Sequence, residues 1–180
     1  MKQKIIIMIF AVIIALAGCA PKTAAPEEPS PEPTPDVVTT ASIVKDEAAF
    51  KKAIGSSGTW IIAILNDLTV NDELVMEGEF HDKNDTAKDL KRKIALYAQD
   101  ADHNVTARYT LTAPKLTVKS PNALIQSGTF KGDVYVEAKN FQLVDATVDG
   151  NVYFTSEDAK STFKADDKSK VTGKQELKSQ

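Results

Sequence analysis

Apolar residues recur at a fixed spacing in the C-terminal half of this chain. The run Gly-Thr-Phe-Lys-Gly-Asp-Val-Tyr-Val at 128–136 is answered eighteen residues later by Ala-Thr-Val-Asp-Gly-Asn-Val-Tyr-Phe at 146–154. In that register apolar residues match at Leu116/Val134/Val152, Val118/Val136/Phe154, Ile125/Leu143 and Phe130/Val148. Identical residues recur at Asn122/Asn140, Thr129/Thr147 and Gly132/Gly150. Alternation of apolar and polar positions within each run predicts short β-strands.

A unit of this length cannot bury the inner faces of its strands by itself, so neighbouring units are expected to stack. We therefore predict an all-β fold, a right-handed parallel β-helix (solenoid) of about five coils. The expected coil starts are Leu68, Ile94, Leu116, Val134 and Val152. An antiparallel β-sandwich is the alternative.

The segment before Leu116 carries a weaker echo of the repeat. Leu68-Thr-Val70, Leu74-Val75, Gly78 and Phe80 match Leu116-Thr-Val118, Leu124-Ile125, Gly128 and Phe130. The repeated Asn122 and Asn140 predict a ladder of inward-facing side-chain amides that hydrogen-bond one another.

The folded domain is expected to span 42–180 and to open with a short amphipathic helix. Residues 46–54 place Phe50 and Ile54 on one side, begin with acidic residues and end before Gly55. This helix would cap the N-terminal end of the stack. Residues 60–65 are apolar at consecutive positions, which predicts a strand covered on both faces.

The first residues have the three regions of an export signal. Lys2 and Lys4 precede the apolar run 5–14, and Leu-Ala-Gly-Cys at 16–19 contains the only cysteine of the chain. This segment resembles the lipobox of bacterial lipoproteins. The resemblance implies that residues 1–18 are cleaved and that Cys19 is lipidated. The protein would then be anchored on the extracytoplasmic side of the cell membrane, or on the outer membrane where the host has one.

Residues 19–41 are rich in proline and glutamate, which predicts an extended tether between anchor and domain. A PxxP ligand for an aromatic groove is the alternative. The formal net charge of -3 becomes more negative once Lys2 and Lys4 are removed, so nucleic acid is not an expected partner. The expected partner is the membrane, which the protein reaches through its lipid. With Cys19 used by the anchor, the domain has no disulfide.

Two polar insertions, 81–92 and 99–105, interrupt the repeat. Thr86-Ala-Lys-Asp89 is expected to form a helical turn in the first. The second contains Asp-Ala-Asp-His-Asn at 100–104, which resembles a calcium loop but lacks the glycine and the final glutamate of an EF-hand. A solvated turn is the favoured interpretation. We predict neither a metal site nor a cofactor, and we expect His81 and His103 at the surface.

Motifs of known catalytic chemistry are sparse, because the chain has neither a Gly-x-Ser-x-Gly elbow nor a phosphate-binding glycine loop. Extracellular β-helices include polysaccharide lyases and hydrolases, which carry charged residues on one outward sheet face. The outward candidates here are Lys131, Asp133, Asp145, Asp149 and Asn151. The register brings Lys131 beside Asp149, which suits such a site or an ordinary surface ion pair. Asp145 is expected to tolerate an apolar replacement.

Tyr135 and Tyr153 occupy equivalent outward positions in the repeat. They would form either a stacking platform for a sugar ring or an aromatic ladder that stabilises adjacent coils. Together with Lys131 and Asp149 they make up the candidate ligand face.

The Gly-Asp/Asn-Val steps between Leu116 and Phe154 resemble the rungs of bactofilins, bacterial polymer-forming proteins built as small β-helices. The resemblance implies the β-helical fold and a capacity to polymerise. Our expectation is a lipid-anchored, non-catalytic and monomeric protein of the cell envelope. Its role would be structural, or binding of an envelope glycan or protein. A carbohydrate-active β-helix enzyme is the first alternative and a bactofilin-like polymer-forming module the second.

Overall fold

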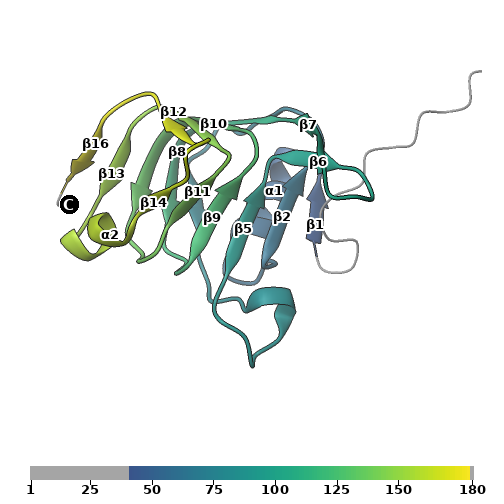
Figure 1. Ribbon diagram of the computed structural model, residues 1–180, viewed down its shortest axis with the longest axis horizontal. Coiled ribbons are helices and arrows are strands. Elements are labelled where there is room, and N and C mark those ends of the chain that lie inside the picture. The colour runs from purple at the N-terminus through teal and green to yellow at the C-terminus, as the bar shows by residue number, and fades with distance from the viewer. Residues whose placement is uncertain (1–40, 179–180) are drawn as a thin grey trace, which may run out of the picture. The chain divides into compact units, whose positions relative to one another are not determined.

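The computed structural model describes residues 41–178, which form a mostly β-stranded domain. Its strands make two main sheets, called sheet I and sheet II here, in which neighbouring strands run parallel although they lie far apart in sequence (Figure 1). The order in sheet I is β1 (Ala41–Val44), β2 (Ile61–Ile64), β5 (Arg92–Ala95), β9 (Ala123–Gln126), β11 (Gln142–Val144) and β14 (Lys164–Ala165). Sheet II contains β3 (Leu68–Thr69), β4 (Leu74–Met76), β8 (Thr110–Val118), β10 (Thr129–Val136), β12 (Thr147–Asp149), β13 (Val152–Phe154), β15 (Lys170–Val171) and β16 (Gln175–Leu177).

The parallel pairing agrees with the all-β expectation and shows that the antiparallel sandwich is wrong. Within the described residues, antiparallel pairing is confined to the hairpin of β6 (Tyr97–Gln99) and β7 (Val105–Arg108) and to a bridge between His81 and Leu90. A second short helix, α2 (Glu157–Thr162), lies between β13 and β14.

The eighteen-residue register is confirmed from Leu116 onward. In sheet II, Val134 lies between Leu116 and Val152, and in sheet I, Ile125 lies opposite Leu143. All of these side chains are buried in one core. The repeat therefore records which apolar side chains stack on one another.

The weaker repeat before Leu116 predicted the wrong strand partners. Leu74, rather than Leu68, lies opposite Leu116, and Leu68 lies opposite Leu111. Ile94 belongs to sheet I, where it pairs with β9. In addition, the register between β8 and β10 shifts within the strands, because β8 has an extra residue there. Alternation along a strand reveals neither such an insertion nor the sheet to which a strand belongs, so the expected starts at Leu68 and Ile94 are wrong.

Helix α1 (Glu47–Ile54) forms as predicted, and the Asp46 carboxylate caps it by accepting from the backbone N–H of Ala49 at 2.8 Å. Phe50 and Ile54 are buried in the main core. The domain does not open with this helix, however, because β1 precedes it and pairs with β2. A four-residue strand is too short to give a periodic signal in the sequence.

Strand β2 is buried at all four positions, as expected for a strand covered on both faces. Ile62 and Ile64 face the main core. The opposite face belongs to a second cluster, formed by Trp60, Ile61, Ala63, Ala95 and Tyr97 with Phe80 packed against it. Tyr97 lies in the hairpin and Phe80 directly precedes the first insertion, so these segments cover part of the outer face of sheet I.

A buried arginine ties this region to the core. Arg92 is fully buried at the start of β5, and its guanidinium donates to the carbonyl oxygens of Ala53 and Gly55 at 2.8 Å each, as well as to that of Glu77. The Cζ atom of Arg92 also lies 4.1 Å from the ring centre of Phe80. Burial lowers the pKa of Arg92 to about 10, so the side chain stays charged at neutral pH. Arg92 thus satisfies carbonyl groups at the end of α1, which a helix leaves without partners.

The first insertion does not form the helical turn expected at 86–89. A 3-10 turn forms earlier, as η1 (Asp82–Asn84). The Asp85 carboxylate instead accepts from the backbone N–H of Ala87 at 3.0 Å. Such a local bond favours a turn over a helix start.

The asparagine ladder exists, but it does not face inward. The side-chain amide of Asn140 donates to the side-chain oxygen of Asn122 at 2.8 Å, and that of Asn122 donates to the backbone oxygen of Leu90 at 2.8 Å. Both asparagines lie at a corner of the chain with φ of 52° and 60°, and Asn140 is exposed. Asparagine tolerates this left-handed backbone better than most residues, which explains its recurrence there.

The repeated glycines mark a place where backbones of sheet II touch. A Cβ atom added to Gly150 would lie 2.1 Å from the carbonyl oxygen of Gly132, and one added to Gly173 would lie 2.5 Å from that of Gly150. The three residues therefore form a column in which a larger side chain has no room.

Candidate functional site

Tyr135 and Tyr153 lie side by side on the outer face of sheet II, as predicted. They are opposite each other in the pairing of β10 with β13. Their ring centres are 4.9 Å apart, with the ring planes inclined at 44°. Both side chains are partly exposed.

Two lysines approach these rings. The Nζ of Lys178 lies 4.5 Å from the ring centre of Tyr153 and donates to the hydroxyl of Tyr135 at 3.2 Å, and this hydrogen bond raises the pKa of Lys178. The Nζ of Lys115 lies 5.4 Å from the ring centre of Tyr135 and pairs with Glu73 at 2.5 Å. The rings thus contact each other and two ammonium groups, so a sugar would have to compete with cation–π contacts for their faces.

Lys131 and Asp149 are opposite each other in the pairing of β10 with β12, as the repeat predicts. Both side chains are exposed. Asp149 accepts a hydrogen bond from the Thr172 hydroxyl at 3.0 Å, and no ion pair joins it to Lys131 within residues 41–178. Exposure leaves this pair without the water-excluded surroundings that strengthen electrostatic catalysis.

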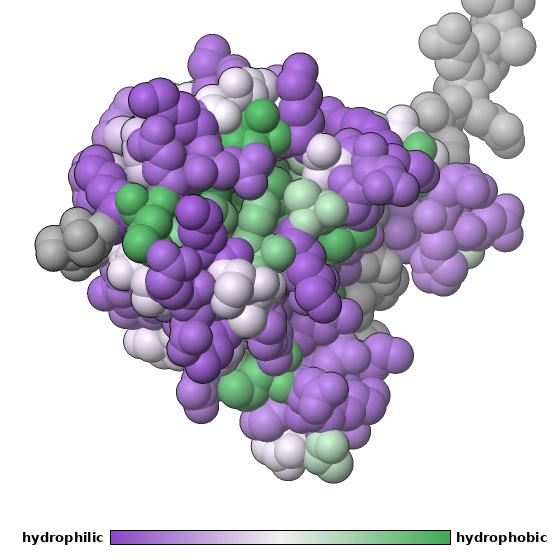
Figure 2. Space-filling model, turned by 60° about the vertical axis from the view of Figure 1, so that its left-hand side comes forward, coloured by the Kyte–Doolittle hydropathy of each residue, from purple (hydrophilic) through white to green (hydrophobic). Residues whose placement is uncertain are grey.

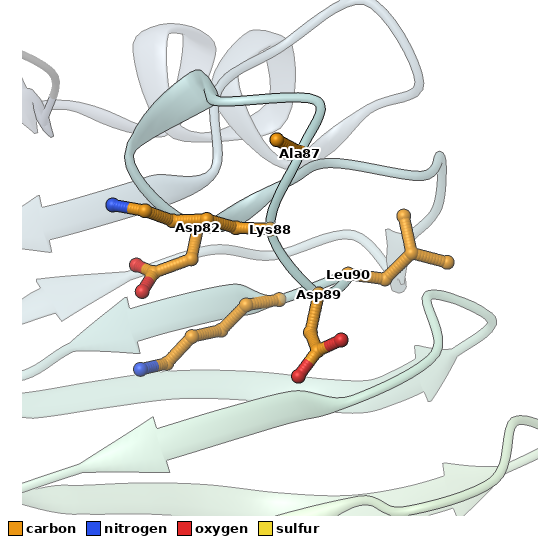
Figure 3. Close-up of a pocket in the computed structure, with 6 residues that line it drawn as sticks. Asp82, Ala87, Lys88, Asp89 and Leu90 are labelled. Carbon is orange, nitrogen blue, oxygen red and sulfur yellow. The ribbon is translucent and has the colours of Figure 1, made fainter.

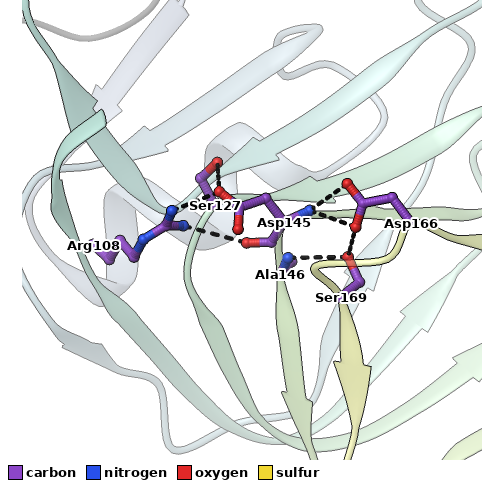
Figure 4. Close-up of polar contacts among 6 residues, drawn as sticks. All are labelled: Arg108, Ser127, Asp145, Ala146, Asp166 and Ser169. Atoms are coloured by element: carbon purple, nitrogen blue, oxygen red, sulfur yellow. Dashed lines mark hydrogen bonds and ion pairs between the residues drawn. The ribbon is translucent and has the colours of Figure 1, made fainter. Parts of the chain in front are cut away.

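A polar cluster that the sequence did not reveal centres on Asp145 (Figure 4). Arg108, from the hairpin, forms an ion pair with the Asp145 carboxylate at 2.6 Å and donates to its backbone oxygen at 3.3 Å. Ser127 donates to the same carboxylate at 3.4 Å. A cavity of about 260 Å³ adjoins the cluster and is lined by Arg108, Gly128, Thr129, Asp145, Thr147 and Lys168.

A second carboxylate supports the Asp145 turn from the following strand connection. The backbone N–H of Asp145 donates to both carboxylate oxygens of Asp166 at 3.0 Å each. Ser169 donates to Asp166 at 2.5 Å and accepts from the backbone N–H of Ala146 at 3.1 Å. The bonds from Ser169 and Asp145 lower the pKa of Asp166. These carboxylates hold backbone groups in place, which is a structural role.

The structure argues against the expectation that Asp145 tolerates an apolar residue. Its φ is 52°, a left-handed conformation in which β-branched side chains are strained. Its carboxylate is also the partner of Arg108. Neither property is visible in the alternation of polar and apolar positions.

The aspartates and asparagine of the second insertion satisfy one another. The Asp100 carboxylate accepts from the backbone N–H groups of Asp102 and Asn104 at 3.0 and 2.9 Å and from the Asn104 side chain at 3.1 Å. The bonds from Asn104 are the main reason that the pKa of Asp100 is lowered. Among residues 41–178, no group of three or more His, Cys, Asp or Glu side chains is placed to hold a metal ion.

Residues of the first insertion line two cavities beside sheet I. One, of about 360 Å³, lies within the insertion, where Figure 3 shows the carboxylates of Asp82 and Asp89 extending below the loop. The other, of about 470 Å³, extends over the outer face of β9 and β11 and includes Gln126 and Gln142. The strand pattern does not single out these glutamines, because nothing in it shows that an insertion will shelter them.

The predicted lipidation site, Cys19, lies outside the described residues, as does nearly all of the predicted tether. In the part of the chain that is described, no helix has the length and apolar character needed to span a membrane. Comparisons with protein-family models, curated proteins and solved structures find no match to this chain.

Proposed function

We propose that the domain is a right-handed parallel β-helix of about five coils, with α1 as its N-terminal cap. The chain order within the sheets supports this proposal. The chain visits sheet I and sheet II alternately, and each return places a strand beside the strand of the previous visit. Parallel connections of this kind are right-handed in about 98 % of cases.

The N-terminal residues support a lipid-anchored protein of the bacterial cell envelope. In this proposal residues 1–18 are an export signal, Cys19 carries the lipid, and residues 19–41 are the tether. The anchor places the domain on the extracytoplasmic side of the membrane. The sequence pattern around Cys19 carries this part of the proposal.

The role that we propose for the domain is non-catalytic, either structural or in binding an envelope glycan or protein, and it acts as a monomer. One observation carries this proposal: the two tyrosines of the candidate ligand face and the acidic groups of the Asp145 cluster are joined to partners within the protein. Tyr135 packs against Tyr153, and Arg108 pairs with Asp145. Groups in such mutual contacts stabilise the surface and have fewer sites left for a reacting substrate.

The test compares the full chain with a Cys19→Ala variant in bacterial cells. The wild-type protein should be found with the membrane fraction and should carry acyl chains by mass spectrometry. The variant should lose both properties. Equal membrane association of a normally cleaved variant would contradict the lipid anchor, and turnover of an envelope glycan by the wild-type protein would contradict the non-catalytic role.

Self-assembly, which the resemblance to bactofilin rungs implies, is a second candidate. Figure 2 brings the C-terminal side forward and shows an apolar region enclosed by hydrophilic side chains. Near the C-terminal end, Leu177 in β16 is 42 % exposed, and Phe163 after α2 and Val171 in β15 are only partly buried. At the opposite edge of sheet I, Ile43 in β1 is 44 % exposed. Edge strands with apolar side chains favour pairing between copies, so filaments in sedimentation assays would support this candidate.

A further inference from the structure

A groove runs between the end of the first insertion and the outer face of sheet I. Its volume is about 470 Å³, within the range of small-ligand sites. The groove is lined by Asp89, Leu90, Lys91, Asn122, Leu124, Gln126, Gln142 and Val144. It lies on a different sheet from Tyr135 and Lys131, so it is distinct from the predicted ligand face.

The floor of this groove alternates amide and apolar side chains in two directions. In the pairing of β9 with β11, Leu124 lies opposite Gln142 and Gln126 lies opposite Val144. Each glutamine therefore has an apolar neighbour both along its own strand and across the sheet. Such a floor offers hydrogen bonds and aliphatic contacts a few ångströms apart.

The two glutamine amides are available to a ligand. Within residues 41–178, neither Gln126 nor Gln142 makes a side-chain hydrogen bond to the protein, and both are partly exposed. Asn122 differs, because its amide is engaged by Leu90 and Asn140. Asn122 thereby fixes the insertion as the wall of the groove, while the glutamines leave donors and acceptors open on its floor.

The charges around the groove favour an uncharged occupant. The floor side chains carry no formal charge, and the insertion contributes one residue of each sign, Asp89 and Lys91. Two further lysines are opposite floor residues in the sheet: Lys164 on β14 is opposite Gln142, and Lys93 on β5 is opposite Leu124 but is buried. A polyanion would need a denser set of cations than these residues provide.

The backbone of the floor argues against an extended peptide. Peptides that bind sheets usually pair with the free edge of a strand. Here β9 is paired with β5 and β11, and β11 is paired with β9 and β14. Recognition must therefore use side-chain amides and aliphatic surface, which match the hydroxyl groups and C–H faces of sugars.

We propose that this groove binds a short segment of an uncharged polysaccharide, with Gln126 and Gln142 as its hydrogen-bonding groups. The proposal rests on the envelope-binding role proposed above and gives it a site and a ligand class. Gln126 and Gln142 bond to sugar hydroxyls or N-acetyl groups, and Leu124 and Val144 contact the ring faces. Because no charge pair is involved, binding should depend little on salt concentration.

The test uses the full mature protein, purified in detergent with its anchor. The probes are two uncharged hexasaccharides, one of β-1,4-linked glucose and one of β-1,4-linked N-acetylglucosamine. Calorimetry should show saturable binding of at least one of them, little changed by added salt. The double variant Gln126→Ala/Gln142→Ala should weaken this binding about tenfold or more, as expected for the loss of two hydrogen bonds. Gln175→Ala, at an exposed position of sheet II, is the matched control and should bind normally.

Unfolding midpoints verify that the variants fold. If the double variant is unstable, the single variant Gln126→Leu, which keeps the side-chain size, replaces it. Three results would overturn the groove: no saturable binding of either hexasaccharide, unchanged binding in the glutamine variants, or tighter binding of polygalacturonate or of a peptide of residues 21–35. Binding lost in Tyr153→Ala but kept in the glutamine variants would overturn the groove alone and leave the envelope-binding role standing. A chain whose membrane association does not depend on Cys19 would contradict the proposed envelope function separately.

Discussion

The side-chain amide of Asn140 donates a hydrogen bond to the side-chain oxygen of Asn122, eighteen residues earlier, at 2.8 Å. Asn140 also has a φ of 60°, so it contributes both a side-chain bond and a left-handed corner. Replacing Asn140 by two different residues can therefore separate the two contributions.

Replacing Asn140 by alanine should destabilise the domain by about 1–2 kcal/mol, because alanine adopts the left-handed conformation at a cost and loses the hydrogen bond. Asn140→Gly loses only the bond and should cost less. Urea unfolding of both variants measures the difference. Equal stability of the two would contradict the left-handed corner.

Gly150→Ala should destabilise the domain by several kcal/mol, about as much as other severe core substitutions. The reason is that the added Cβ would lie 2.1 Å from the carbonyl oxygen of Gly132. Gly55→Ala is the control, because the nearest atoms there are 3.7 Å away and φ is -71°. Chemical denaturation compares the two variants, and similar losses would argue against the close backbone contact in sheet II.

Asp145→Val should cost about 2–3 kcal/mol, since it places a β-branched residue at positive φ and removes the partner of Arg108. Asp145→Asn keeps a residue that tolerates this backbone and should cost at most about 1 kcal/mol, the usual worth of an exposed ion pair. Thermal unfolding tests this order. A valine variant as stable as the asparagine variant would show that the turn is not strained.

The domain should lose stability in acid partly through Asp166. Its pKa in the folded state is below the ordinary value of 3.8, so its carboxylate stabilises the fold above that pH. This contribution is lost as pH falls below 3.8 and through the lower folded pKa. The urea midpoint measured from about pH 5 to about pH 2 should therefore fall less steeply in Asp166→Asn than in the wild type.

The neighbouring variant Asp167→Asn removes the same charge without removing the bonds from Ser169 and the Asp145 backbone. Its acid profile should follow that of the wild type. If both variants flatten the profile equally, general charge and not the Asp166 turn is responsible.

Purified protein should not cleave pectin, alginate or peptidoglycan, and Lys131→Ala should behave like the wild type in reducing-end and unsaturated-product assays. The reason is that Lys131 and Asp149 are neighbours on an exposed face. Reproducible polysaccharide cleavage that Lys131→Ala abolishes would establish the enzyme alternative.

The repeat determined the part of the fold in which equivalent strands follow one another at a constant spacing, with no inserted residues. From Leu116 to Phe154 the apolar pattern alone gave the correct neighbours, including Tyr135 beside Tyr153 and Lys131 beside Asp149. The caps of α1 could likewise be read locally, because a helix start depends on residues within one turn. Before Leu116 the insertions and the extra residue in β8 broke the spacing, and the same reasoning then misplaced Leu68.

The sequence by itself thus determined the strand repeat and the outward position of the tyrosines, because both are written in residues at a constant spacing. Only the tertiary structure decided that Arg92 is buried beneath Phe80, that Arg108 reaches Asp145, and that the first insertion forms a wall beside Gln126 and Gln142. These contacts join segments with no common period. Their formation depends on how the chain between them folds, and alternation along one strand carries no information about that path.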